Sequence, residues 1–393
     1  MATLPATVPS SDLDPFAPEF THDPFEGYRQ WRDLGRAVRL SAHDTWVLPG
    51  YEDVRAALAD DTTFSTARGT GLLEESHTSS VISSDRQRHP VLRSVLSSKT
   101  SPRAMAALRD DIFAQVDALV ADAVDRGSID AVGDIAEVIP VSVVADLIGL
   151  PDDDREPLLP GADVVNRLFG PLTPELAARL SGAGAYFEWM AAKCDRSILR
   201  PDSWGSAILD AVDDGLIARD EGVWLMNGYL VAGMDTTVNA LSSLLHLFAT
   251  QPETWERIVA DPSLAAGAFE EIVRLESPIQ GFFRVTTRDV DYDDVVLPAG
   301  ERVLLSFGSA NRDERHFVDA DAFRPERRPI DHVGFGFGAH GCAGQALARL
   351  ESAALMTSLL KRVDRFEPTG EPVRRSHPIV RGISSLPVRL HAR

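Results

Sequence analysis

The sequence predicts a mainly helical protein with a minor β region, folded as a single large domain. Residues 223–250 form the longest apolar segment with helical spacing, and such an all-round apolar helix is typical of a protein core. Most of the chain before residue 276 repeats its apolar residues at helical spacing. Short runs typical of strands are confined to residues 37–48 and 283–307. With 393 residues, the chain is long enough to bury a large core.

The N-terminal part predicts an arm, a hairpin and a long loop. Residues 1–22 are rich in Pro, Ser, Thr and Asp, and we expect an extended arm there, followed by one domain over residues 23–393. Residues 65–84 lack periodicity and predict a long loop, and loops of this length tend to be functional. The other elements expected are helices over 24–34 and 51–60 and strands over 37–40 and 45–48.

The middle of the chain predicts successive helices, and a few short strands follow residue 278. Residues 160–174 contain proline at both ends and predict an irregular stretch. The helices are expected over 85–98, 103–126, 134–149, 175–198, 223–250, 253–260 and 264–276. The strands are expected over 283–287, 290–292, 295–297 and 302–307.

Composition and charge exclude several classes of protein. The net charge of −20 argues against nucleic acid and against an anionic membrane surface as partners. No secretory signal and no apolar run of about 20 residues is readable, so we expect no membrane association. Two cysteines, Cys194 and Cys342, make no disulfide framework, and one cysteine alone cannot build a zinc site. We therefore expect a cytoplasmic protein.

One of these cysteines lies in a glycine-rich loop that leads into a helix. Residues 335–344 read FGFGAHGCAG, and residues 345–357 have the apolar spacing of a helix. At the start of a helix, free backbone N–H groups and the helix dipole favour a thiolate at Cys342. The glycines leave room for a flat cofactor to approach the backbone. This arrangement predicts a ligand for a soft or redox-active metal.

The spacing of Phe335, Gly338, His340, Cys342 and Gly344 resembles the haem-binding loop of the cytochrome P450 family. The resemblance covers about residues 22–390 and implies the cytochrome P450 fold, with haem b as the cofactor. It implies that Cys342 is the axial thiolate ligand of the haem iron, where a thiolate favours O–O cleavage. His340 would then reach a haem propionate, and Phe335 would pack beside the sulfur.

A second motif, AGMDTT at residues 232–237, interrupts the long apolar helix. Taken alone, the threonines could simply bond to carbonyls one turn back and bend the helix. The segment resembles the oxygen-activation sequence of the same family. The resemblance implies that Asp235 and Thr236 form an acid–alcohol pair that delivers protons. It also implies that Gly233 lets the helix open locally, so that dioxygen and water fit.

A third motif is Glu271 followed by Arg274, which resembles the structural Glu-x-x-Arg pair of the family. The pair would tie its helix to the loop before the cysteine. An arginine of the segment 323–327 would be the third partner, and both Arg324 and Arg327 qualify.

A haem carries two carboxylates, so a chain that buries it needs cations at several points. By resemblance, His89 and Arg93 in the segment DRQRHPVLR, together with Arg284 and His340, would bind the propionates. One departure lies just before His89, where the family has Asp-Pro-Pro and this chain has Asp85 followed by Arg-Gln-Arg. This departure could change how tightly the start of the helix is bound.

Without a membrane anchor, the chain resembles the soluble bacterial class of the family. We expect a monomer that uses O2 and receives electrons from an external ferredoxin or a flavin/iron–sulfur reductase. Arg324, Arg327 and Arg328 would present a basic docking surface on the side of the cysteine loop, and the overall acidic charge makes that patch matter more for an acidic partner.

The segment ESPIQGFFR at residues 276–284 resembles members that hydroxylate or O-demethylate para-substituted aromatics such as 4-methoxybenzoate. So do SANRD at 309–313 and RGISSLPV at 381–388. The implied substrate is a methoxybenzoate or a neutral methoxyphenol. Alternatives are a terpenoid or natural-product intermediate, or a haem sensor without turnover. The residues expected to face the substrate are Ile279, Phe282, Phe169, Leu72 and Leu73.

Overall fold

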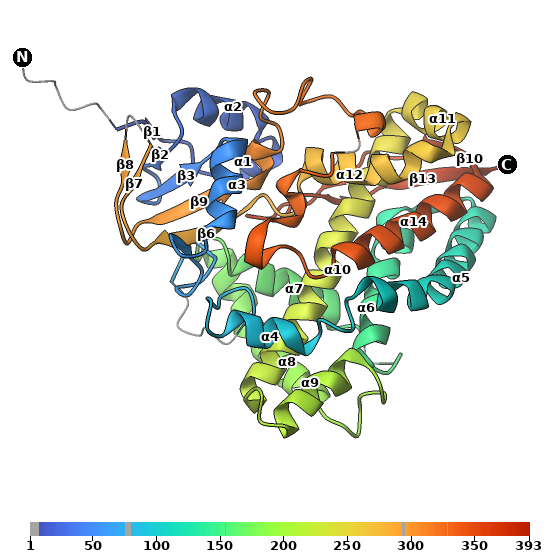
Figure 1. Ribbon diagram of the computed structural model, residues 1–393. Helices are drawn as coiled ribbons and strands as arrows, with labels where there is room; N and C mark the ends of the chain where they lie inside the picture. Colours follow the sequence, from blue (N-terminus) through green and yellow to red (C-terminus); the bar gives the residue numbers. More distant parts are fainter. Residues whose placement is uncertain (1–7, 75–79, 154, 293–294, 328) are drawn as a thin grey trace, which may run out of the picture.

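A computed structural model describes residues 8–74, 80–153, 155–292, 295–327 and 329–393. It confirms a mainly helical chain with a small β region in one domain. In Figure 1, the long helix α10 (Arg219–Thr250) crosses the middle of the molecule. The larger sheet lies on one side of α10, and most other helices lie on the opposite side.

The larger sheet has the strand order β1-β2-β3-β9-β6-β4. Its strands β2 and β3 pair antiparallel, β3 and β9 pair parallel, and β9 and β6 pair antiparallel. Arg284 on β6 lies opposite Val303 on β9. The strands are β1 (Ser10–Ser11), β2 (Val38–Leu40), β3 (Thr45–Leu48), β4 (Phe64–Ser65), β6 (Gly281–Thr286) and β9 (Arg302–Ser306).

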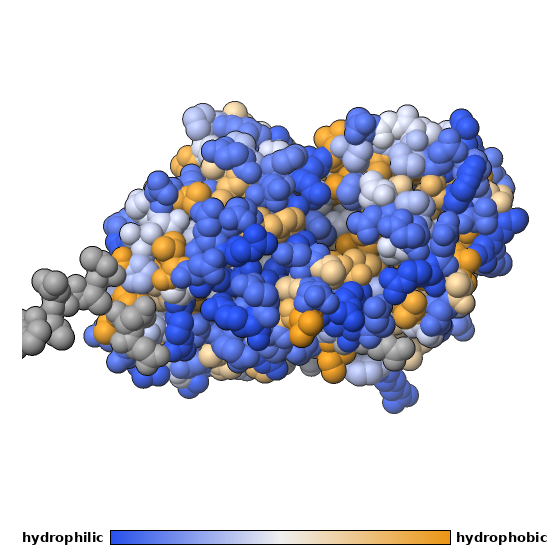
Figure 2. Space-filling view, turned by 90° about the horizontal axis from the view of Figure 1, so that it is seen from above, coloured by the Kyte–Doolittle hydropathy of each residue, from blue (hydrophilic) through white to orange (hydrophobic). Residues whose placement is uncertain are grey.

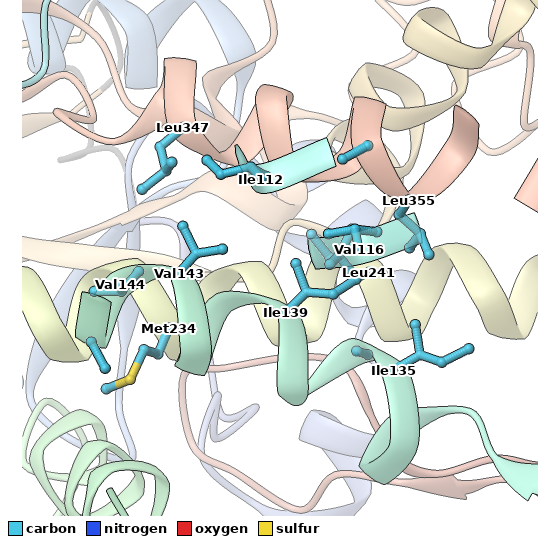
Figure 3. Close-up of a cluster of buried hydrophobic side chains, with 14 of the residues drawn as sticks. Ile112, Val116, Ile135, Ile139, Val143, Val144, Met234, Leu241, Leu347 and Leu355 are labelled. Atoms are coloured by element: carbon cyan, nitrogen blue, oxygen red, sulfur yellow. The ribbon is translucent and has the colours of Figure 1, made fainter. Parts of the chain in front are cut away.

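The largest hydrophobic core surrounds α10 and includes side chains of several other helices. Figure 3 shows buried side chains from these helices meeting, among them Val116 of α5, Ile139 of α6, Leu241 of α10 and Leu355 of α14. Because α10 has apolar neighbours on most sides, most of its side chains are buried, as the sequence predicts. The surrounding helices are α5 (Pro102–Arg126), α6 (Val138–Ile148), α12 (Ala265–Glu276) and α14 (Gln345–Arg362).

The remaining elements are shorter and complete the two sides of the molecule. The helices are α1 (Pro18–His22), α2 (Phe25–Leu34), α3 (Tyr51–Ala59), α4 (His89–Val95), α7 (Leu158–Arg167), α8 (Pro174–Lys193), α9 (Trp204–Asp213), α11 (Pro252–Ala260) and α13 (Phe307–Ala310). The strands are β5 (Ser128–Asp130), β7 (Val290–Asp291), β8 (Val296–Leu297), β10 (Val363–Pro368), β11 (Val373–Arg374), β12 (Ile383–Ser385) and β13 (Pro387–Ala392).

The first part of the long loop predicted after residue 65 is bound through its backbone. The carbonyl of Thr70 accepts a hydrogen bond from the N–H of Phe283 at 2.8 Å, and the N–H of Leu72 donates to the carbonyl of Phe169 at 2.8 Å. Arg302 donates to the carbonyl of Gly71 at 2.6 Å. The loop is thus tied to β6, to β9 and to the turn after α7.

Two predictions along the chain are wrong. Residues 160–174 are irregular only between residues 168 and 173, because α7 occupies Leu158–Arg167 and α8 starts at Pro174. Pro160 lies in the first turn of α7, where its missing N–H has no intrahelical partner to lose. The N-terminal arm is only partly extended, since Pro18–His22 form the short helix α1. Helix α9 has no counterpart among the predicted elements.

The face shown in Figure 2 is largely hydrophilic, with apolar residues scattered among charged ones. This agrees with the net charge of −20. No helix in the described ranges combines the length and the apolar character needed to cross a bilayer.

Candidate functional site

The loop before Cys342 is closed by its own backbone and rests on α3. The N–H of Cys342 donates to the carbonyl of Phe335 at 2.8 Å. Gly336 and Gly338 have φ values of 65° and 69°, which favour glycine. A Cβ at Gly338 would also lie 2.4 Å from the carbonyl oxygen of Leu58. The loop therefore needs glycine both for its turn and for its contact with α3.

Burial raises the pKa of the Cys342 thiol, whereas the N–H groups of Gly344 and Gln345 and the charges of Arg93 and Arg349 act in the opposite direction. The helix start thus acts in the predicted direction, towards the thiolate, and desolvation opposes it. Metal coordination would supply the missing driving force. No three His, Cys, Asp or Glu side chains within the described ranges form a group that could hold a metal ion.

Four of the predicted cofactor residues lie together above this loop. The rings of His89 and His340 stand 4.2 Å apart between their centroids. Arg93 lies one turn after His89 on α4 and donates to the carbonyl of Gly341 at 2.7 Å. Arg284 is 4% exposed and donates to the carbonyl of its neighbour Phe283 at 2.8 Å.

Within the described part of the chain, Arg93 and Arg284 form no ion pair with a carboxylate, and burial favours the neutral form of both histidines. Burial lowers the pKa of Arg284 to about 10, with Asp85 acting in the opposite direction. Burial, followed by Arg284 and His89, lowers the pKa of His340 to about 3. The Nε2 atom of His89 is buried and has no hydrogen-bond partner among the described residues. Buried donors and cations of this kind fit the two carboxylates of a haem.

The unusual segment before His89 is well bound by Asp85. Its carboxylate accepts hydrogen bonds from the Ser65 hydroxyl at 2.5 Å and from the N–H and hydroxyl of Thr66, both at 2.9 Å. The hydroxyl of Thr66 also lies 3.4 Å from Nε2 of His340. Asp85 thus fixes the start of α4 beside the cation group without the family's prolines.

One face of α10 is left uncovered although the helix is in the core. Ala232 is exposed, and Gly233 and Thr236 are half-exposed. Thr236 donates its hydroxyl to the carbonyl of Ala232 at 2.7 Å. The helix does not open at Gly233, because α10 is continuous from Arg219 to Thr250. Instead, a Cβ at Gly233 would lie 3.0 Å from Val144, so the glycine allows close packing of α6.

Asp235 is buried next to this face and is bound by three partners. Asn166 of α7 donates to Oδ2 at 2.5 Å, and Asn239 donates to Oδ1 at 3.3 Å. Arg375, from the C-terminal part, forms an ion pair with Oδ1 and also with Asp163 of α7, at 2.8 Å. Sequence reasoning missed Asn166 and Arg375, since neither lies in a motif.

The predicted structural pair is fully buried on the other side of the cysteine loop. Glu271 and Arg274 form two hydrogen bonds of 2.8 Å, and the side chains are 0% exposed. Nε of Arg327 lies 3.1 Å from Oε1 of Glu271. Arg324 contributes only its backbone N–H, at 3.0 Å, so Arg327 is the third charged partner. The helix α12 is thereby tied to the segment before the loop.

Two of the five predicted substrate residues, Phe169 and Phe282, are in contact. The rings of Phe169 and Phe282 pack edge to face with centroids 5.3 Å apart, and Ile279 pairs with Val380 in an isolated β-bridge. Leu72 is instead buried in the cluster around Trp31, on the side of the N-terminal arm, so its prediction is wrong. Leu73 is 50% exposed and carries no packing contact with the aromatic pair among the described clusters.

Known proteins resemble this chain over nearly its whole length. The family model described as cytochrome P450 matches residues 262–389. Cytochrome P450 CYP199A2 of Rhodopseudomonas palustris is 38% identical over 98% of this chain and 95% of its own length. Cyclomarin C epoxidase CymV of Salinispora arenicola is 35% identical over 91% of this chain and 94% of its own length.

Solved structures share the same architecture. CalO2 superposes with a TM-score of 0.85 at 27% identity and covers 96% of this chain and 98% of its own. Myxobacterial cytochrome P450 CYP267B1, in complex with myristic acid, superposes with a TM-score of 0.84 at 31% identity, over 96% of this chain and 98% of its own.

Proposed function

The chain belongs to the cytochrome P450 family of haem-thiolate monooxygenases, and we propose that it oxidises a small aromatic molecule at a C–H bond. The observation that carries this proposal is the combination of two features. Arg93, His89 and His340 lie together at the loop of Cys342, and α10 is partly exposed at Ala232 and Thr236. In this proposal, the exposed part of α10 faces the cysteine loop across the cofactor. The family assignment leaves the alternative of a non-catalytic haem sensor without support.

In this proposal, Cys342 ligates the iron of haem b, and His89, Arg93, Arg284 and His340 bind its two carboxylates. When bound, the haem supplies the activation of O2 and the insertion of one oxygen atom into a C–H bond. Phe335 shields the sulfur from water. Its ring stands under the Arg349 guanidinium at 4.7 Å, which fixes the ring beside the start of α14.

Asp235 and Thr236 move the protons that oxygen activation consumes. The hydroxyl of Thr236 bonds to Ala232 within its own helix, so it must rotate to serve an acceptor in the site. Asp235 must exchange one of its present partners, Asn166 or Arg375, before it can pass a proton. The contacts of Asp235 with α7 and with the C-terminal part therefore control when it can transfer a proton.

Thr236→Ala tests this role. We expect the yield of oxidised product per NADH to fall and the release of hydrogen peroxide to rise, because proton delivery is impaired. Thr237→Val is a matched control, since Thr237 is buried on the same helix. Unchanged coupling in Thr236→Ala would end the proposed role of this pair.

The substrate is a flat ring held by Phe169, Phe282 and Ile279. The edge-to-face pair of Phe169 and Phe282 suits an aromatic guest, and Phe307 adds a third ring 6.1 Å from Phe282. The reaction is hydroxylation or O-demethylation of a para-substituted methoxybenzoate or methoxyphenol. Arg68 is a cation of the loop after residue 65 and is already paired with Glu74 at 2.8 Å, which supports a neutral phenol over a carboxylate.

Binding spectra compare these substrates directly. We expect 4-alkyl methoxyphenols to shift the haem towards high spin at lower concentrations than 4-methoxybenzoate. The reverse order would favour a bound carboxylate. A second candidate is a natural-product intermediate, which the 35% identity with the epoxidase CymV favours. Release of formaldehyde from a methoxy substrate separates O-demethylation from that alternative.

Electrons come from an external ferredoxin or a flavin/iron–sulfur reductase, and we place the protein in the cytoplasm, where the free thiols Cys194 and Cys342 stay reduced. The proposed basic patch needs revision. Arg327 is bound to buried Glu271, Arg324 pairs with Asp319, and Arg328 lies outside the described residues. We assign the docking surface instead to exposed Phe337 in the cysteine loop, beneath the Arg55 guanidinium.

Cys342→Ser tests the assignment of the haem ligand. The reduced protein with carbon monoxide should lose the Soret band of a thiolate-ligated haem. A spectrum identical to that of the wild type would contradict the assignment.

A further inference from the structure

Glu270 on α12 precedes the structural Glu271 in the sequence but contacts a different part of the molecule. Its carboxylate accepts hydrogen bonds from Nε of Arg349 on α14 at 2.6 Å and from Nη2 of the same side chain at 3.1 Å. Oε2 of Glu270 also lies 3.1 Å from Nε2 of His332, just before the cysteine loop. Glu270 therefore joins α12, α14 and the residues that lead into the loop.

The hydrogen bonds of His332 indicate which ring nitrogen carries the proton. Nδ1 accepts from the N–H of Gly334 at 3.0 Å, so the ring is neutral and donates from Nε2 to Glu270. Burial raises the pKa of Glu270, but the hydrogen bonds from His332 and Arg349 outweigh it, and the pKa is lowered. At neutral pH, Glu270 is thus an anion that binds one cation, Arg349, and one neutral donor, His332.

Both partners of Glu270 lie against the aromatic ring at the start of the cysteine loop. The guanidinium of Arg349 is 4.7 Å from the centre of the Phe335 ring, and the ring of His332 is 5.5 Å from it. The carbonyl of Phe335 accepts the N–H of Cys342 at 2.8 Å. Burial raises the pKa of the Cys342 thiol, and the charge of Arg349 acts against it. Glu270 therefore holds a cation close to the proposed haem ligand.

We propose that Glu270 is a positioning residue that sets the charge beside the haem ligand. Arginine stays charged at physiological pH, so only a neighbouring anion can offset its field. A cation without such an anion would favour the reduced iron, because reduction adds negative charge. Glu270 offsets Arg349 and holds its guanidinium on the Phe335 ring, which keeps the reduction potential of the iron low. This inference rests on the haem assignment and not on the identity of the substrate.

Glu270→Gln removes the charge and keeps the shape of the side chain. We expect the midpoint reduction potential of the substrate-free holoenzyme to rise by about 59 mV, which is about ten-fold in the one-electron equilibrium. A redox titration measures it. Glu270→Asp keeps the charge and should restore most of the wild-type potential. Glu326→Gln is the control, because Glu326 is exposed and paired with Arg257, and its removal should leave the potential unchanged.

Arg349→Met removes the opposite charge and should lower the potential, since Glu270 keeps His332 as a donor. The Arg349 side chain is 39% exposed, so this variant should fold even if the loss of the buried carboxylate prevents folding of Glu270→Gln. The double variant removes both charges and should return the potential towards the wild-type value. A merely structural role would shift both single variants in the same direction.

A higher potential in Arg349→Met, or no rise in a folded Glu270→Gln, would overturn the proposal, because a loosened loop and not a charge would then explain the result. The reduced carbon monoxide spectrum of every variant should stay that of a thiolate-ligated haem. Absence of that spectrum from the wild type would overturn the Cys342 assignment, and this inference with it.

Discussion

Two buried arginines flank the cysteine loop, and their surroundings differ. Arg274 on α12 forms two hydrogen bonds with Glu271 and donates to the carbonyls of Asn311 and Ala320 at 2.6 and 2.7 Å. Arg284 on β6 donates to the carbonyl of its own neighbour and has no carboxylate partner in the described ranges. Arg274 therefore has its counter-charge and its acceptors within the protein, whereas Arg284 has no counter-charge in the described ranges.

This difference separates a structural charge from a binding charge. A buried ion pair with all its hydrogen bonds made is self-sufficient, and removing one partner exposes the full desolvation cost of the other. A buried cation without a counter-charge is already unfavourable, so its removal costs the protein alone little. Replacing arginine by methionine should therefore lower the stability of the fold at Arg274 and weaken haem binding at Arg284.

Replacing Arg274 by Met should break the complete site and give the largest effect. Glu271 would keep only Arg327 as a charged partner, and we expect a loss of about 3–5 kcal/mol in the free energy of unfolding. Urea unfolding followed by circular dichroism measures it. Arg324→Ala is the control, because its exposed guanidinium does not touch Glu271, and it should cost less than about 1 kcal/mol. Equal losses in both variants would contradict a self-sufficient site.

Replacing Arg284 by Met should weaken haem binding without lowering the stability of the haem-free protein. We expect haem release to apomyoglobin to become roughly 10- to 100-fold faster, because a charged hydrogen-bond donor to the carboxylates is lost. The urea midpoint of the haem-free protein should not decrease. Arg288→Met, whose side chain is 70% exposed, is a control that should leave both quantities unchanged. A destabilised haem-free protein would show that Arg284 is structural.

The site around Arg284 should also make the haem-free protein sensitive to acid. The pKa of His340 is lowered from 6.5 to about 3 in the folded chain, so between these values the unfolded chain binds more protons. Stability is therefore lost as the pH falls through this window. His340→Gln should flatten the dependence, leaving the share of His89, whose pKa is lowered too. Bound haem carboxylates should reduce the slope of the wild type; a steeper slope would contradict the proposed pairing.

Asn166→Ala should have the smallest effect, at a site whose charges are already paired. Asp235 keeps Arg375 and Asn239, so we expect a loss of about 1 kcal/mol in urea unfolding. Asn166→Asp places a second carboxylate beside Asp235 and should cost more, because like charges repel. A smaller loss for Asn166→Asp than for Asn166→Ala would mean that the Asn166 contact is dispensable.

Regular elements were predictable where a periodic pattern coincides with burial. Helix α10 and the strands β2 and β3 lie where the sequence predicts them. Helix α7 was missed because Pro160 and Gly161 are turn signals. Gly161 is needed because α7 packs closely against α8, and a Cβ at this position would lie 2.1 Å from the ring of Tyr186. Such a requirement comes from a distant helix and leaves no local pattern.

The site was predictable as far as its motifs extend. Cys342, His340 and the Glu271–Arg274 pair stand in recognisable spacing. The partners of Asp235 do not, since Asn166 is 69 positions away and Arg375 is 140 positions away. Leu72 was misplaced because a loop without periodicity does not indicate which way its side chains point. Only the fold decides these long-range contacts.

The loop over residues 68–72 has a consequence for how substrate range can change. Its hydrogen bonds to Phe283, Phe169 and Arg302 all use the loop's own backbone atoms. Most side-chain replacements there leave those bonds intact. Tolerance to replacement is therefore set by the side chains alone, and it is confined to Arg68 and Leu73, which are exposed. Thr70 and Leu72 are buried, Gly69 has a φ of 87°, and a Cβ at Gly71 would lie 2.9 Å from the backbone of Phe169. Laboratory evolution of the loop should therefore vary residues 68 and 73 and keep residues 69–72.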